Sequence, residues 1–204
     1  MKKIFLIRHG ESEWNILHKI QGQKNVPLTD NGREQAKQLG NRLINENIDI
    51  IYTSDLSRAL ETANTISKFI RRPAIKSKEI REINFGPWEG MTLEEIKKGY
   101  KQEYCKWLKE PHKLKLDDGE TLEMLEKRAM GFVNDILNNN NSKNIAIVSH
   151  SATLKVIILN LLGIGNSYYK NITLKNVSVS IIERRDYNNV LTLLNDTSHL
   201  KGLK

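Results

Sequence analysis

Three segments of the sequence change abruptly from apolar to polar residues, and each change brings residues that can bind or attack an anion. The first apolar run ends in Arg8 and His9, the second is followed by Arg58, and the third ends in Ser149 and His150. A guanidinium group binds phosphate oxygens through paired hydrogen bonds, and a neutral imidazole nitrogen can attack phosphorus. These residue types therefore predict a site that holds a phosphoryl group and transfers it to a histidine.

Such a site also needs a proton donor. The transition state of phosphoryl transfer is loose and carries negative charge on its outer oxygens, so surrounding positive groups stabilise it. Hydrolysis of a phosphate monoester is very slow without a catalyst, and the departing alkoxide requires a proton. A carboxylic acid kept protonated by the negative field of the phosphate would supply it. Water would then hydrolyse the phosphohistidine.

The elements that must position these residues follow the pattern of an α/β fold. Three short apolar runs are typical of strands buried on both faces: 4–7, 48–52 and 145–148. Apolar residues at helical spacing predict helices at 30–45, after Asp55 to about 70, at 121–138 and at 152–162. Because ligands bind beyond the carboxyl ends of the strands in an open parallel sheet, the three polar junctions should converge.

The remaining segments complete a three-layer sandwich with a mainly parallel central sheet. A short strand is expected at 73–78, and a C-terminal hairpin formed by 177–183 and 190–194 should add antiparallel pairing. Thr92 and Glu95 form a capping-box pattern, and one helix after it would carry apolar residues as far as Trp107. We expect a single domain over residues 1–204, with a helical insertion at about 84–130 over the site.

Length and composition exclude several other classes of protein. The chain has 204 residues, of which 39% are hydrophobic and 27% charged, so collagen-like and disordered proteins are excluded. Its one cysteine, Cys105, cannot close an intramolecular disulfide. No apolar run is long enough to cross a bilayer, and the apolar run near the N-terminus is too short for a signal peptide. We therefore expect a soluble cytoplasmic protein with no membrane partner.

The net charge of +8 does not by itself indicate a nucleic-acid partner. The 32 Lys and Arg residues are spread along the chain, with no block of five or more. A nucleic-acid-binding surface normally concentrates its basic residues. Five lysines between 97 and 109 give a basic helix surface, which a solvated helix face explains equally well, and such a surface can also steer anionic substrates. No nucleic-acid partner is expected.

Four motifs, in this order along the chain, resemble those of the histidine phosphatase superfamily, also called phosphoglycerate mutase-like. They occupy residues 6–15 (LIRHGESEWN), 54–63 (SDLSRALETA), 81–90 (REINFGPWEG) and 148–151 (VSHS). The resemblance covers essentially the whole chain and is greatest to the small bacterial phosphatases of the family. One departure is Asn25, which stands where many members carry Asp.

The resemblance implies a role for each site residue. The catalytic residues would be His9 as nucleophile, Glu82 as general acid and then base, and His150. The phosphate-binding residues would be Arg8, Arg58 and Asn15, together with His150 and the N–H of Ser151. Substrate choice would lie in the 17–25 loop, which includes Gln21 and Gly22, and in the 84–116 segment. The resemblance implies no metal, and His18, His112 and His199 show no metal-ligand spacing. No cofactor is expected for the predicted phosphatase.

Each of these roles competes with a structural alternative. His9 could cap a helix from a loop, and His150 could be a satisfied core histidine. Arg58 could be a surface partner of Glu61, a contact worth a few tenths of a kcal/mol. Asn15 could cap a turn, and Glu79 and Glu89 are alternatives to Glu82 as the acid.

The predicted activity is metal-independent hydrolysis of a small phosphorylated metabolite through a phosphohistidine. Candidate substrates are α-ribazole phosphate and phosphoserine, and a broad-specificity enzyme also fits. A cofactor-dependent phosphoglycerate mutase is the alternative, but the insertion is modest and only residues 196–204 follow the last strand, which favours an open, hydrolytic site. A non-catalytic phosphate-sensing or protein-binding module should have lost one catalytic residue, whereas all are present. The protein would be a monomer or a homodimer.

Overall fold

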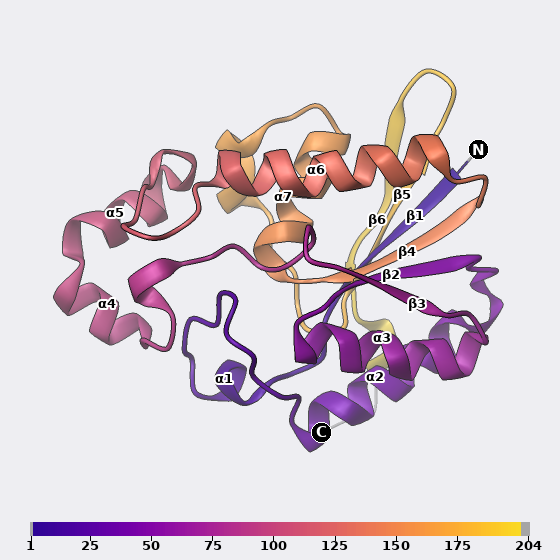
Figure 1. Ribbon diagram of the computed structural model, residues 1–204, viewed down its shortest axis with the longest axis horizontal. Helices are drawn as coiled ribbons and strands as arrows, with labels where there is room; N and C mark the ends of the chain where they lie inside the picture. The colour runs from indigo at the N-terminus through magenta and orange to yellow at the C-terminus, as the bar shows by residue number, and fades with distance from the viewer. Residues whose placement is uncertain (1, 201–204) are drawn as a thin grey trace.

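The computed structural model describes residues 2–200, and its centre is a six-stranded sheet (Figure 1). The predicted domain also includes residues 1 and 201–204, which lie outside the described residues. The strands are β1 (Lys2–Arg8), β2 (Ile50–Ser54), β3 (Ala74–Ser77), β4 (Asn144–Ser149), β5 (Val179–Arg184) and β6 (Asn189–Asp196). They lie in the order β3-β2-β4-β1-β5-β6.

The pairing of the strands confirms the predicted fold class. β1, β2, β3 and β4 pair in parallel, whereas β5 pairs antiparallel with both β1 and β6. The C-terminal hairpin therefore supplies the antiparallel part of the sheet, as its sequence predicts. The strands expected at 48–52 and 73–78 are also present, with bounds shifted by one or two residues.

Helices cover both faces of the sheet and make it a three-layer sandwich (Figure 1). The helices are α2 (Asp30–Leu43) and α3 (Ser57–Ile70) on one face, and α6 (Leu122–Asn139) and α7 (Ser151–Leu161) on the other. Successive side chains of a strand point to opposite faces, so Ile4 and Leu6 join the core beneath α6 and α7. Phe5 and Ile7 join the core beneath α2 and α3. A continuous apolar run is thus required in β1 because both of its faces are buried.

The segment between β3 and β4 contains a group of short helices. They are η2 (Gly86–Trp88), α4 (Leu93–Gly99), α5 (Lys101–Lys109) and η3 (Pro111–Lys113). The predicted capping box is present, since Thr92 and Glu95 exchange hydrogen bonds at the start of α4. Figure 1 shows α4 and α5 on the side toward which the carboxyl ends of the parallel strands point.

The prediction of a single helix that continues to Trp107 is wrong. Tyr100 has φ −134° and ψ 47°, outside the helical region, and it separates α4 from α5. The break turns Trp107 toward the aromatic cluster of this segment, where its ring meets Phe85 edge-on with centroids 5.3 Å apart. The preceding Gly99, which has a low helix propensity, is the local signal for the break.

Four further short helical turns occur between the larger elements and near the end of the described chain. They are α1 (Glu13–Ile16), η1 (Ile44–Glu46), η4 (Asn166–Asn171) and η5 (Ser198–Leu200). None of the helices within residues 2–200 is long and apolar enough to cross a membrane.

Candidate active site

The register of two central strands brings the two histidines together. Arg8 at the end of β1 is the parallel partner of Ser149 at the end of β4. The next residues are His9 and His150, and the His9 N–H donates to the Ser149 carbonyl at 3.0 Å. Their rings lie with centroids 5.1 Å apart and are both buried. The sheet therefore joins two junctions that lie far apart in the sequence.

Contacts at both ring nitrogens fix the orientation of His9. Its Nδ1 lies 2.7 Å from the carbonyl oxygen of Gly10, so this nitrogen carries the proton and donates it. The Nε2 atom then keeps its lone pair. Burial, and next the positive charges of Arg58 and Arg8, hold the pKa of His9 well below its usual value of 6.5. Gly10 is itself fixed, because its N–H donates to Thr62 Oγ1 at 3.0 Å.

Arg58 donates a hydrogen bond to the unprotonated nitrogen of His9. It stands in the first turn of α3, only 1% of its surface is exposed, and its Nε is 3.3 Å from His9 Nε2. Its two terminal nitrogens donate to the carbonyls of Lys24 and Gly22, both at 2.8 Å. Burial lowers the pKa of Arg58 to about 10, so the guanidinium stays charged at neutral pH. It is not the exposed partner of Glu61, which pairs with Arg33 instead.

Two further residues leave hydrogen-bonding atoms free beside His9. Arg8 donates through Nη1 to the Leu174 carbonyl at 2.6 Å, but its buried Nε has no protein partner among the described residues. Both ring nitrogens of His150 are likewise buried without a partner there. Burial and the charge of Arg58 hold the pKa of His150 well below 6.5. Unpartnered buried groups are costly, so this arrangement is typical of a site that a ligand completes. His150 is not a satisfied core histidine.

Glu82 reaches the same site from the loop after β3. Its side-chain oxygens accept N–H groups from Ala152 and Thr153, both at 3.2 Å, at the start of α7. The residue is 9% exposed, and the negative charge of its carboxylate opposes the lowering of the pKa of Arg8 and Arg58. The start of α7 therefore fixes a carboxyl group close to both guanidinium groups.

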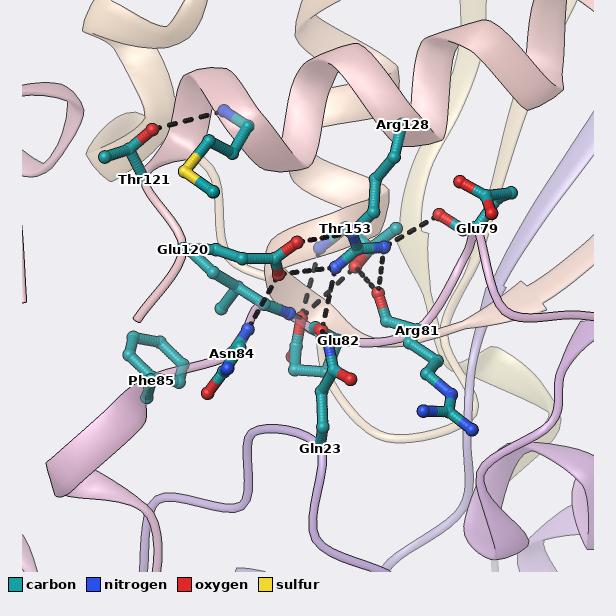
Figure 2. Close-up of polar contacts among 12 residues, drawn as sticks. Gln23, Glu79, Arg81, Glu82, Asn84, Phe85, Glu120, Thr121, Arg128 and Thr153 are labelled. Carbon is teal, nitrogen blue, oxygen red and sulfur yellow. Dashed lines mark hydrogen bonds and ion pairs between the residues drawn. The ribbon is translucent and has the colours of Figure 1, made fainter. Parts of the chain in front are cut away.

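An ion pair behind the site holds the Glu82 loop (Figure 2). Arg128 on α6 forms a two-point contact with Glu120, through Nε at 2.7 Å and Nη2 at 2.8 Å. The same guanidinium donates to the carbonyls of Glu79, Arg81 and Glu82 at 2.7 to 2.9 Å. One side chain thus fixes the backbone on the N-terminal side of the carboxyl group. Sequence reasoning missed this pair.

Comparison with known proteins identifies the family of this chain. The model of the histidine phosphatase superfamily (branch 1) matches residues 4–197. The chain belongs to the histidine phosphatase superfamily. It is 35% identical to phosphoserine phosphatase 1 of Hydrogenobacter thermophilus over 98% of this chain and 95% of that protein.

Solved structures of the superfamily have the same fold. YhfR of Bacillus stearothermophilus has a TM-score of 0.92 and 30% identity, covering 98% of this chain and all of that one. A phosphoserine phosphatase of Entamoeba histolytica, solved with 3-phosphoglyceric acid, has a TM-score of 0.87 and 37% identity over 98% of this chain and all of that one. The resemblance read from the four sequence motifs is therefore confirmed.

Asn15, the expected additional phosphate ligand of the superfamily, has an occupied oxygen and a free nitrogen. Its Oδ1 accepts from the backbone and hydroxyl of Ser12, at 3.0 and 2.9 Å, and from Asn176 Nδ2 at 3.2 Å. The oxygen thus caps α1, as the structural alternative proposes. The side-chain nitrogen of Asn15 forms no hydrogen bond within residues 2–200 and stays available to a ligand. Asn176, which also donates to the carbonyls of His9 and Gly10, was missed by sequence reasoning.

The loop expected to choose the substrate is tied to the site. Gln21 accepts a hydrogen bond from Ser12 Oγ at 2.9 Å, and Gly22 offers its carbonyl to Arg58. Gly22 has φ +48°, and a Cβ there would lie 1.9 Å from Glu89 Oε1. That Glu89 oxygen accepts the N–H of Gln23 at 2.8 Å. Glu89 therefore holds this loop. The side-chain oxygen of Gln21 is occupied by Ser12, and Gly22 contributes its backbone carbonyl to Arg58.

The last expected donor is the backbone of Ser151. It is the first residue of α7, and no hydrogen bond from its N–H is formed within the described residues. A helix N-terminus presents such groups to anions. Of the alternative acids, Glu79 is exposed and Glu89 binds the loop, whereas Glu82 lies at the start of α7 and interacts with the charges of Arg8 and Arg58. Within residues 2–200 no group of three or more His, Cys, Asp or Glu side chains could hold a metal ion.

Proposed function

We propose that this chain is a metal-independent phosphomonoesterase that hydrolyses a small phosphorylated metabolite through a phosphohistidine at His9. The observation that carries the proposal is the unprotonated Nε2 of His9, which accepts a hydrogen bond from Arg58 Nε, while Nδ1 of the same ring donates to Gly10. Unpartnered buried atoms of Arg8 and His150, and the guanidinium of Arg58, surround that nitrogen. Nucleophile and positive groups are thus in place before the substrate arrives, which is how electrostatic stabilisation is most effective.

In the first step, the phosphoryl group leaves its alcohol for His9. The lone pair of Nε2 forms a bond to phosphorus, and the bond from phosphorus to the ester oxygen breaks. Protonated Glu82 gives its proton to that oxygen, so a neutral alcohol departs. The guanidinium groups of Arg8 and Arg58 balance the charge on the three outer oxygens. Nδ1 keeps its proton and its contact with Gly10, which stabilises the positive charge of the phosphorylated ring.

In the second step, water takes the place of the alcohol. The Glu82 carboxylate accepts a proton as the water oxygen attacks phosphorus, and the bond from phosphorus to Nε2 breaks. Inorganic phosphate leaves, His9 returns to its neutral form, and Glu82 is again protonated. The same carboxyl group therefore acts as acid and then as base.

The names of relatives indicate which substrates to examine first. The similar proteins include phosphoserine phosphatases, one of them solved with 3-phosphoglyceric acid, and an α-ribazole phosphatase. We propose phosphoserine and 3-phosphoglycerate as the leading candidates and α-ribazole phosphate as the next. A cytoplasmic protein acting as a monomer or homodimer, without a nucleic-acid or membrane partner, fits this role.

The test is hydrolysis of p-nitrophenyl phosphate in excess chelator by the wild-type protein and by His9→Ala. We expect turnover that survives the chelator and is lost in the variant. Brief mixing with ³²P-labelled substrate, followed by alkaline denaturation, should trap an alkali-stable, acid-labile label on the wild-type protein only. A protein that binds phosphate but forms no labelled intermediate would be a sensing module, and one that returns the label to an organic acceptor instead of water would be a mutase.

A further inference from the structure

A small cleft opens beside Glu82, and Arg58 is not among the residues that line it. Its volume is about 330 Å³, which suits a compact metabolite. Glu82 and the start of α7 form one wall, and aromatic side chains form another. The lining residues that matter here are Glu82, Phe85, Trp107, Ser151, Lys155 and Tyr169.

Lys155, on the α7 wall of the cleft, forms no ion pair with an acidic side chain of the described residues. It follows Ser151 by one helical turn on the same face of α7, and its Nζ lies 3.7 Å from the ring centre of Tyr169. It forms no ion pair and donates no side-chain hydrogen bond within residues 2–200. A lysine that is half removed from water and unpaired is costly, and an anionic group on a ligand would offset that cost.

The position of Lys155 separates it from the phosphoryl site. A helix rises 1.5 Å per residue, so Lys155 lies about 6 Å along α7 from the Ser151 N–H. Arg8, Arg58 and His150 already surround His9. The lysine therefore faces the part of a substrate that extends from the phosphate into the cleft.

We propose that Lys155 binds a carboxylate on the substrate, so that this protein prefers phosphate esters of small hydroxy acids to the same esters without a carboxylate. The assignment rests on the proposed function, which it deepens. Apart from Glu82, no acidic side chain lines the cleft. The cleft therefore selects the carboxylate and not an amino group, and 3-phosphoglycerate and phosphoserine both satisfy it.

The charge of Lys155 should make this preference depend on pH. Burial lowers the pKa of Lys155 to about 8, against the opposing attraction of Glu82 and with a small further lowering by Arg8. The phenol of Tyr169 is neutral in this range, because burial raises its pKa well above 10, and Lys170 across the cleft donates to the Lys109 carbonyl. The preference should thus be strongest below pH 8 and weaken above it.

The test compares two esters that differ in the carboxylate alone, 3-phosphoglycerate and glycerol 3-phosphate. The measured quantity is the ratio of their kcat/KM values. We expect Lys155→Met to lower this ratio about 10- to 100-fold, the range for a hydrogen bond to a charged group. Lys155→Arg should keep the preference and extend it above pH 8. Phosphoserine and phosphoethanolamine form a second such pair and should behave alike.

Lys97→Met is the matched control. Lys97 also lies over a tyrosine, with its Nζ 5.8 Å from the Tyr104 ring centre, but it is exposed on α4 outside the cleft. Lys97→Met removes one positive charge, as Lys155→Met does, and should leave the ratio of the two kcat/KM values as in the wild type. An equal ratio in wild type and Lys155→Met, or an equal loss for both esters, would overturn the assignment.

The proposed function can fail separately. If the wild-type protein hydrolyses none of the four esters and no p-nitrophenyl phosphate, the phosphatase proposal is wrong. Calorimetry on His9→Ala then still measures whether 3-phosphoglycerate binds more tightly than glycerol 3-phosphate, and whether Lys155→Met removes the difference. Equal binding of the two esters would overturn the role of Lys155 as well.

Discussion

The Nε atom of Arg58 lies 3.3 Å from Nε2 of His9, while Nδ1 of the same ring lies 2.7 Å from the Gly10 carbonyl. A neutral imidazole has one donor and one acceptor nitrogen, so these contacts leave a single arrangement of the proton. The acceptor nitrogen points to the place where a phosphoryl group would bind. Arg58 therefore fixes the orientation of the His9 ring and, in the proposed mechanism, stabilises the negative charge on the phosphoryl oxygens.

The protonation of His9 can be measured in the free protein. Below its pKa the ring would carry two protons and lose its lone pair, and burial together with Arg58 and Arg8 holds that pKa well below 6.5. We expect ¹⁵N NMR at pH 7 to report a proton on Nδ1 and none on Nε2, with no titration of this ring between pH 7 and 6.5. The His9→Gln spectrum identifies the signals. A midpoint at or above 6.5 would contradict this environment.

Arg58→Lys tests whether the fork of the guanidinium is needed in addition to its charge. Lysine cannot hold the Lys24 and Gly22 carbonyls and approach His9 at the same time. Loss of one preorganised donor in an active site costs about 100-fold or more in turnover. We expect a decrease of that size in kcat with p-nitrophenyl phosphate. Arg33→Lys, at the exposed pair with Glu61, is the control and should keep full activity.

Glu82→Gln should slow poor leaving groups much more than good ones. An alkyl alcohol requires a proton as it leaves, whereas p-nitrophenolate leaves readily without one, and general acid catalysis contributes about 100- to 10,000-fold. We therefore expect the kcat/KM of phosphoserine, which reports the step in which the alcohol leaves, to fall in that range and that of p-nitrophenyl phosphate to fall less. Equal losses of kcat/KM with both esters would show that another group donates the proton.

Arg128→Met should also slow the hydrolysis of alkyl esters more than that of p-nitrophenyl phosphate, but by less than Glu82→Gln does. Arg128 holds the carbonyls of Arg81 and Glu82 but lies behind the loop and is not placed against the phosphoryl site. Its loss leaves Glu120 unpaired and loosens the loop, so we expect the kcat of alkyl esters to fall about tenfold. Their KM should change less. A variant that loses stability but keeps the wild-type ratio of alkyl to aryl turnover would make the role of Arg128 purely structural.

Gly22→Ala should damage stability and activity together. A Cβ at this positive φ would lie 1.9 Å from the Glu89 carboxylate, which holds the loop beneath Arg58. We expect the free energy of unfolding to fall by about 1–3 kcal/mol and kcat/KM to fall as Arg58 loses its support. Gly131→Ala in α6 meets nothing within 4 Å and should be neutral or slightly stabilising. Urea denaturation of the three proteins measures the difference.

The sequence predicts the sheet and the position of His9 and His150 because their signals are local. An apolar run buried on both faces identifies β1 and β4, and the polar residue that follows each run must lie at the carboxyl end of the sheet. The spatial neighbours of these residues depend on strand order, which no local pattern specifies. Asn176 is the clearest case, since it donates to the His9 carbonyl from a loop that precedes β5.

Lys155 and Arg128 were missed for a different reason. Each is a charged residue on a helix whose apolar residues dominate the sequence pattern, so the pattern predicts a surface position for it. The ring beside Lys155 belongs to Tyr169 in η4, and the carbonyls that Arg128 holds belong to the loop after β3. The spacing of Lys155 one turn after Ser151 was available in the sequence, but it acquires meaning only once the start of α7 is known to face the site.

The pairing of β1 with β4 and β5 has a consequence for how the protein is made. His9, the proposed nucleophile, is synthesised together with β1, but the strand that brings His150 beside it begins at Asn144, and the other neighbour of β1 begins at Val179. A ribosome-bound chain that lacks these strands contains His9 but no completed pocket around it. Activity should therefore appear during translation only once β4 and β5 have paired with β1. Fragments that end before residue 144 should be inert toward phosphate esters at any concentration.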